Sequence, residues 1–137
     1  MTTDTPQTNA VQHAVSLGTA FRYCWTRWTF AGRASRSEYW WATLANMPIG
    51  ILLPAIEHAL WGVPVLTFVY TLAALIPCFG LTVRRLHDIG RSGFWYWVVL
   101  VPLVGPIVLL VFELLPSEPG ENRFGPVPNT TACQAGE

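Results

Sequence analysis

Residues 84–93 read Arg-Arg-Leu-His-Asp-Ile-Gly-Arg-Ser-Gly, and they form a dense polar island between two long apolar runs. Residues 59–83, before the polar island, carry no charge, and a third apolar run follows from residue 94 to about residue 115. A helix of about 20 apolar residues crosses the hydrocarbon core of a membrane. The polar island therefore predicts a loop at a membrane surface that joins two spanning segments.

The composition also indicates a membrane protein. The chain has 137 residues, of which 52% are hydrophobic and 12% charged, whereas a soluble domain carries about 25% charged residues. So few charges could not cover the surface of a domain in water, so we expect lipid to be part of its solvent. The length allows one domain. The formal net charge is zero, and we expect no nucleic-acid partner.

A first spanning segment is predicted over residues 39–56, which carry no charge. Its connection to the second run is short, so these two segments should form an antiparallel hairpin. Asn46 is expected to bond across helices, with contact to a substrate as the alternative. Glu57 at the far end is expected to be solvated, with a role in a proton path as the alternative.

The N-terminal part predicts an amphipathic helix between residues 16 and 30. Its apolar residues recur at helical spacing, with two arginines off the stripe; the stripe consists of Leu17, Ala20, Phe21, Cys24 and Trp28. Such a helix lies in a membrane interface or packs against the rest of the protein, and both can hold at once. Ser35 followed by Glu38 fits a capping box, which predicts the start of the next helix.

The third apolar run leaves two interpretations open because Pro102 and Pro106 interrupt it. A kinked spanning helix is the preferred one, and a re-entrant hairpin that turns at residues 102–106 is the alternative. The expected fold is therefore an all-α membrane protein, with an N-terminal interfacial amphipathic helix and three transmembrane helices. Residues 15–128 should form a single integral membrane domain between disordered tails at residues 1–14 and 129–137.

The arginines predict the orientation, because basic loops stay cytoplasmic. With three spans, all the arginines except Arg123 fall on one side: Arg22, Arg27, Arg33, Arg36, Arg84, Arg85 and Arg91. The N-terminus is then cytoplasmic and the C-terminus external. A re-entrant third segment would instead return the tail to the cytoplasmic side.

The basic face is the candidate site. Arg84, Arg85 and Asp88 should share one side of a helix and anchor the chain at the membrane surface. The alternative is a site for anionic lipid headgroups or phosphate, which arginine forks suit. The candidate lipid or partner contacts are Arg33, Arg36, Arg84, Arg85, His87, Asp88 and Arg91.

Enzymatic, metal and cofactor chemistry finds little support in the sequence. His87 beside Asp88 could orient an imidazole, but no partnered nucleophile and no metal-ligand spacing accompany it. Cys24, Cys78 and Cys133 are odd in number and far apart, so neither a disulfide framework nor a zinc site is indicated. Cys78 is expected to be a small packing residue.

Three ordered motifs, at residues 30–41, 84–93 and 120–126, closely resemble a known family. It is the domain of unknown function 805 (DUF805) family of YhaH-like bacterial inner-membrane proteins, and the resemblance covers roughly residues 17–128. The signature positions are Gly32, Ser35, Glu38, Tyr39, Trp40, Gly90, Ser92, Gly93, Asn122, Gly125 and Pro126. Phe124 is a small departure, since tyrosine is commoner there. The resemblance implies a multi-pass protein of the bacterial inner membrane, and it implies no activity.

The sequence leaves three classes of function open. The preferred one is a non-enzymatic membrane component whose basic cytoplasmic face binds anionic lipid headgroups or a membrane-protein partner. The alternative is a small transporter or channel subunit, which would need a homo-oligomer because three spans are few for a pore. A membrane enzyme is the third, and it would need a polar cavity that holds His87, Asp88 and Glu38 together.

Overall fold

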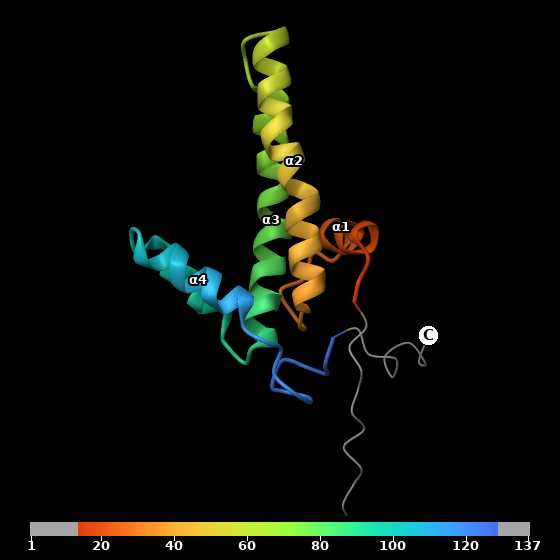
Figure 1. Ribbon diagram of the computed structural model, residues 1–137, viewed down its shortest axis with the longest axis vertical. Helices are drawn as coiled ribbons and strands as arrows, with labels where there is room; N and C mark the ends of the chain where they lie inside the picture. Colours follow the sequence, from red (N-terminus) through yellow and green to blue (C-terminus); the bar gives the residue numbers. More distant parts are fainter. Residues whose placement is uncertain (1–13, 129–137) are drawn as a thin grey trace, which may run out of the picture.

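The computed structural model describes residues 14–128, where every regular element is a helix apart from one isolated bridge between Asn122 and Gly125. Figure 1 shows the elements in chain order, which are α1 (Leu17–Thr26), α2 (Arg36–Leu60), α3 (Val65–Asp88), the 3₁₀ helix η1 (Gly93–Leu100) and α4 (Val104–Leu114). The predicted all-α class is confirmed. The tails predicted at residues 1–14 and 129–137 lie outside the described residues, apart from Ala14.

Helices α2 and α3 form the tall antiparallel hairpin that carries the rest of the molecule (Figure 1). The Oγ of Ser35 accepts a hydrogen bond from the backbone N–H of Glu38 at 3.2 Å, so the predicted helix start is confirmed. With 25 residues, α2 is about 37 Å long, which exceeds the about 30 Å of a hydrocarbon core. Asn46 accepts hydrogen bonds from Trp25 on α1 and Tyr70 on α3, so its predicted bonding across helices is confirmed.

The far turn of this hairpin contradicts one expectation. Glu57 is 2% exposed, and its carboxylate accepts hydrogen bonds from the backbone N–H of Leu66 and from both the N–H and the hydroxyl of Thr67. The first N–H groups of a helix lack partners within it, and Pro64 provides no side-chain cap. Glu57 is therefore not solvated, because α2 uses its carboxylate to cap α3.

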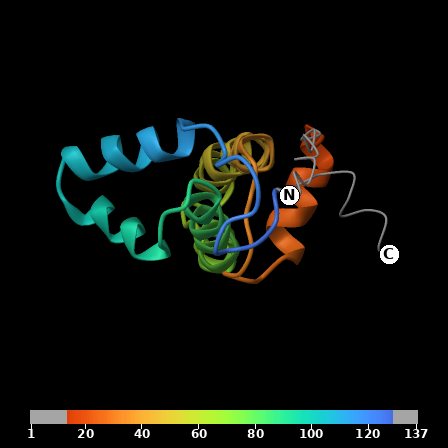
Figure 2. The same cartoon turned by 90° about the horizontal axis from the view of Figure 1, so that it is seen from below.

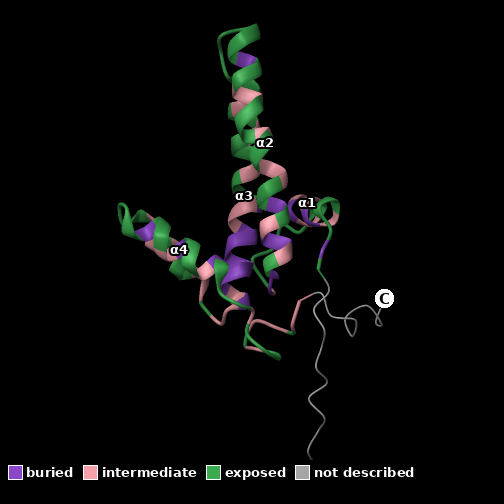
Figure 3. Ribbon diagram, viewed as in Figure 1, coloured by how far each residue is buried: buried purple, intermediate pink, exposed green. Residues whose placement is uncertain are grey.

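Burial is concentrated at one end of the hairpin, here called the base, where α2 begins and α3 ends. Figure 3 shows this end buried, while most of the rest of α2 and α3 is exposed. α3 is the one described helix long and apolar enough to cross a membrane by length and composition, and only 22% of its apolar window is buried. Apolar surface on that scale marks a contact with lipid or protein. The count of three spans is not confirmed.

Helix α1 packs across the base half of the hairpin. Ala20 and Cys24 on its apolar stripe are 0% exposed and belong to the main core, together with Ala42 of α2 and Leu81 of α3. Packing against the rest of the protein, one of the two interpretations of this helix, is thus observed. Its position in a membrane interface stays a prediction.

The third apolar run is not one straight helix. Leu103 has a φ of 66°, and the chain reverses there, so that η1 and α4 form a hairpin beside α2 and α3 (Figure 2). Its legs of 8 and 11 residues are each about 16 Å long at the rise of their helix types. The third run therefore reverses, as the alternative interpretation expected, and neither leg is long enough to cross a membrane. Re-entry into a membrane stays a prediction.

The reversal decides where the tail lies. After α4 the chain returns to the base, where the backbone N–H of Glu118 donates to the carbonyl of Asp88 at 2.9 Å. The tail of the described chain, which ends at Pro128, therefore lies beside the polar island. The external C-terminus stays a prediction.

Gly105 provides a test of the hairpin. A Cβ at this position would lie 1.9 Å from the carbonyl oxygen of Val98, so Gly105→Ala should force the legs apart. We expect a loss of stability near or above the top of the about 1–3 kcal/mol typical of overpacking, measured by thermal unfolding in detergent.

The matched control is Gly50→Ala in α2, where an added Cβ meets nothing within 4 Å. It should be neutral or stabilising by up to about 1 kcal/mol, because alanine favours the helix. Equal melting temperatures of the two variants would contradict the packed hairpin.

Candidate functional site

The candidate site is a cluster of buried charges at the base, here called the base cluster. Its members are Arg33, Glu38, Arg84, Arg85 and Asp88, which are between 0% and 6% exposed. Arg33 precedes α2, Glu38 lies in its first turn, and the other three lie near the C-terminal end of α3. Burying ionised groups is costly unless each has a partner of opposite charge and further hydrogen bonds, so the pairing decides whether this cluster can exist.

Asp88 is the centre of the base cluster. Its Oδ1 lies 3.0 Å from the Nε of Arg33, and its Oδ2 accepts from the guanidinium of Arg85 and from the hydroxyl of Ser117. Arg85 and Asp88 are three residues apart on α3, a spacing that brings side chains together on a helix. One carboxylate thus neutralises two buried guanidinium groups from different parts of the chain.

Both of these arginines also hold the segment after α4. Arg33 donates from Nη1 to the carbonyl of Gly120 at 2.6 Å and from Nη2 to that of Glu118 at 2.7 Å. Arg85 donates to the carbonyls of Glu113 and Leu115, which lie where a helix end leaves carbonyls without partners. The planar fork of arginine suits this role, and it ties the tail to the base.

Arg84 has a different partner from the one the sequence suggested. Its Nη1 lies 3.0 Å from Oε1 of Glu38 on α2, so Arg84 does not join Arg85 on Asp88. Three buried atoms of this pair have no hydrogen-bond partner within the described chain, namely Glu38 Oε2, Arg84 Nε and Arg84 Nη2. The Arg84–Glu38 pair thus joins α2 to α3 beside the Asp88 centre.

His87 turns away from both charge pairs. Its Nδ1 lies 3.2 Å from the carbonyl oxygen of Gly32, and its ring stacks on Phe124 with centroids 3.9 Å apart. Asn122 donates to the carbonyl of His87 at 3.0 Å. The structure therefore does not place His87, Asp88 and Glu38 around one polar cavity, which the enzyme interpretation required.

The remaining signature residues shape the same end. Tyr39 donates its hydroxyl to the carboxylate of Glu113 and meets Trp40 edge to face. Ser92 caps η1 through Phe94. Gly32, Gly90 and Gly125 have positive φ, which favours glycine. A Cβ on Gly93 would lie 2.9 Å from Val83, and Pro126 follows Gly125 near the end of the described chain.

The candidate contacts therefore divide into two groups. Arg33, Arg84, Arg85 and Asp88 are buried and paired, whereas Arg36 and Arg91 are exposed. The guanidinium of Arg91 lies 5.2 Å from the ring of Trp95 and 5.6 Å from that of Phe112, within the range of a cation–π contact. Among residues 14–128 no group of three or more His, Cys, Asp or Glu residues could hold a metal ion.

Sequence reasoning missed two partners in this site. Glu113 is 8% exposed and bonds Tyr39 from the far end of the third run. Ser117 bonds Asp88 from the segment after α4. A carboxylate near the end of an apolar run was the available signal, because buried charges require partners.

Comparisons with known proteins agree with the resemblance of the sequence motifs. The family described as "Protein of unknown function (DUF805)" matches residues 27–126. The inner membrane protein YhaI of Escherichia coli K12 is 43% identical over 97 residues, which cover 70% of this chain and 82% of YhaI. The inner membrane protein YhaH of the same strain is 38% identical over 104 residues, covering 72% and 86%. No solved structure matches the chain significantly.

The role of Asp88 can be tested with Asp88→Asn. This change keeps the shape of the side chain but leaves two buried guanidinium groups without their shared counter-charge. We expect a loss of about 3–5 kcal/mol, measured by thermal unfolding in detergent. Release of the tail should also speed tryptic cleavage after Arg123.

Glu121→Gln is the matched control, since Glu121 is an exposed acid in the same tail. It should change stability by no more than about 0.5 kcal/mol and leave cleavage unchanged. If Asp88→Asn behaved like this control, Asp88 would not be the centre of the base cluster.

Proposed function

We propose, since this chain belongs to the DUF805 family of proteins of unknown function, that it is a non-enzymatic component of the bacterial inner membrane whose basic base contacts anionic lipid headgroups. Its relatives YhaI and YhaH are both named as inner membrane proteins. The contacts fall to the exposed arginines, because the buried ones are already paired inside the protein.

One observation carries this proposal: the chain is neutral overall, but the exposed surface of residues 14–128 is not. Four of the six acids in this range are buried, namely Glu38, Glu57, Asp88 and Glu113, against three of its eight arginines, Arg33, Arg84 and Arg85. The exposed charges within residues 14–128 are five arginines (Arg22, Arg27, Arg36, Arg91 and Arg123) and two acids (Glu118 and Glu121). The exposed part of the described chain is therefore positive.

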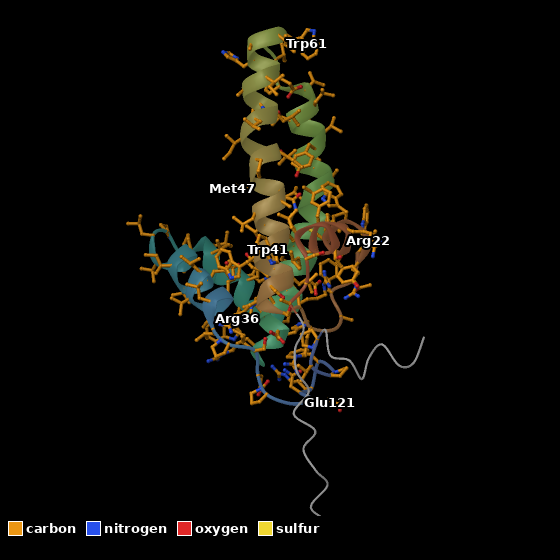
Figure 4. All side chains as sticks on the ribbon, turned by 45° about the vertical axis from the view of Figure 1, so that its right-hand side comes forward. Arg22, Arg36, Trp41, Met47, Trp61 and Glu121 are labelled. Carbon is orange, nitrogen blue, oxygen red and sulfur yellow. The ribbon has the colours of Figure 1, made fainter. Side chains whose placement is uncertain are left out.

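The positive charges lie toward one end. Figure 4 shows Arg22 and Arg36 in the half of the molecule nearer Glu121, with Trp61 at the opposite end. Arg91 follows α3 at the base, and Arg123 donates to the carbonyl of Gly90. None of the five takes part in an ion pair within the described range. Their guanidinium groups are available for phosphate oxygens, which arginine forks bind in pairs.

From this charge distribution we also propose a membrane topology. Basic segments stay cytoplasmic, so the base faces the cytoplasm and α2 and α3 cross the bilayer. The apolar hairpin of η1 and α4 then enters the cytoplasmic leaflet and returns, because each leg is about half as long as the about 30 Å core. The segment up to Pro128 lies on the cytoplasmic side in this arrangement.

No observation favours the transporter or channel alternative over this one. Asn46, Glu57 and Glu113 are polar groups in or beside the apolar runs that a transport path could use, but each bonds to a neighbouring element in the folded chain. A homo-oligomer or a membrane-protein partner remains compatible with the proposed role.

The lipid contact is tested by the double variant Arg36→Gln, Arg91→Gln. A basic residue near an anionic membrane surface contributes about 1 kcal/mol, so retention of phosphatidylglycerol should fall by about thirtyfold at low salt. Native mass spectrometry of the detergent-solubilised protein measures this retention.

Glu121→Gln is the control for this experiment, because it alters a charge in the tail without removing a cation. It should retain lipid at least as well as the unmodified protein, and added salt should weaken retention in both. Unchanged retention in the double variant would refute the headgroup contact.

The topology is tested by reporters fused after the last residue. We expect a fluorescent protein fused there to be bright and alkaline phosphatase to be inactive, because both results mark the cytoplasmic side. The same reporters placed in the turn between α2 and α3, beside Gly62, should give the opposite results. An active phosphatase at the C-terminus would overturn the re-entrant arrangement.

A further inference from the structure

Two cysteines that are far apart in sequence meet in the fold. Cys24 of α1 and Cys78 of α3 line one cavity of about 220 Å³ between α1, α2 and α3. Cys24 is fully buried in the core, and Cys78 packs against that core. Both are free thiols, so the sequence expectation that Cys78 only fills space leaves this contact unexplained.

Cys78 also lines a second and larger space. A groove of about 600 Å³ runs along α3 and beside η1, and it shares Asn46, Cys78 and Thr82 with the inner cavity. Cys78 is half-buried, whereas Cys24 is 0% exposed. A molecule in the groove therefore meets the sulfur of Cys78 first, with the sulfur of Cys24 behind it.

The walls of the groove indicate what kind of molecule fits. Phe79 meets Phe30 and Tyr96 edge to face, with ring centroids 5.5 and 4.6 Å apart, and Tyr70 and Trp97 complete the aromatic lining. Aromatic walls favour a flat ring through offset and edge contacts. The groove lies along the apolar face of α3, which the proposed topology places in the bilayer. A ligand of the groove would therefore enter from the lipid phase.

We propose that Cys24 and Cys78 form a reversible thiol–disulfide pair, and that a membrane quinone entering the groove oxidises it. Both S–H bonds break and one S–S bond forms, which releases two electrons and two protons. The quinone takes up both and leaves as the quinol, so the reaction needs no other oxidant. The product would join α1 covalently to α3 and so fix the N-terminal helix on the spanning hairpin.

The two sulfurs differ in their access from the groove, which gives them different roles. The neighbouring Cys78 thiol and burial raise the pKa of the Cys24 thiol, so Cys24 keeps its proton. A thiolate is the reactive form in thiol chemistry. Cys78 at the groove is therefore the sulfur that reacts first, and Cys24 closes the disulfide.

The test uses the full chain in lipid nanodiscs with Cys133→Ser, so that only the described thiols remain. The probe is a fully substituted benzoquinone with a short alkyl tail, which cannot add to a thiol. We expect the loss of both maleimide-reactive thiols, counted after denaturation, with one quinol formed per chain. Cys24→Ser and Cys78→Ser should each keep the remaining thiol and form no quinol.

The route is tested by two neighbours on α3. Ala74 lines the groove, whereas Ala73 is exposed outside it. Ala74→Trp should slow quinol formation severalfold and Ala73→Trp should leave its rate unchanged; Ala74→Leu gives a smaller, graded effect should the tryptophan disturb folding. Two free thiols after excess quinone would overturn the proposal, and so would equal rates in all the alanine variants.

Discussion

The structure depends on the carboxylate of Asp88, which two buried guanidinium groups share. An ionised group removed from water loses several kcal/mol of solvation unless its partners replace it. Arg33 and Arg85 meet this condition only when the loop before α2, the end of α3 and the tail come together. The three sequence motifs are therefore three parts of one electrostatic unit, which explains why short polar segments punctuate an apolar chain.

This unit also positions the hairpin of η1 and α4. Arg85 binds the carbonyls at the end of α4, and Tyr39 binds Glu113, so the second leg of the hairpin is held at the base where the first leg began. The turn at Leu103 lies at the other end of the hairpin. A chain segment that is apolar on all sides needs lipid or protein around it, and the hairpin satisfies that need while its polar ends stay together.

Burial separates two kinds of arginine that look alike in the sequence. Those of the base cluster are structural, since removing their partner would leave an unpaired charge inside the protein. The exposed ones have no acidic partner within the described chain and give its surface a positive charge. Acids are buried in the same way, and Glu57 for example caps α3. The composition is therefore neutral, whereas the exposed surface of the described residues is positive. The proposed headgroup contact follows from this sorting.

Low charge and long apolar runs indicated a membrane protein, Ser35 and Glu38 marked the start of α2, and the motifs identified the family. These signals are local or compositional, so they can be read without knowledge of the fold. The folded chain was needed to show that the third run reverses, that Arg84 pairs with Glu38, that Glu57 is buried and that Cys24 and Cys78 line one cavity. Each of these outcomes depends on contacts between groups that are far apart in the sequence and that replace the water which buried atoms lose. Spacing along the chain does not specify these contacts.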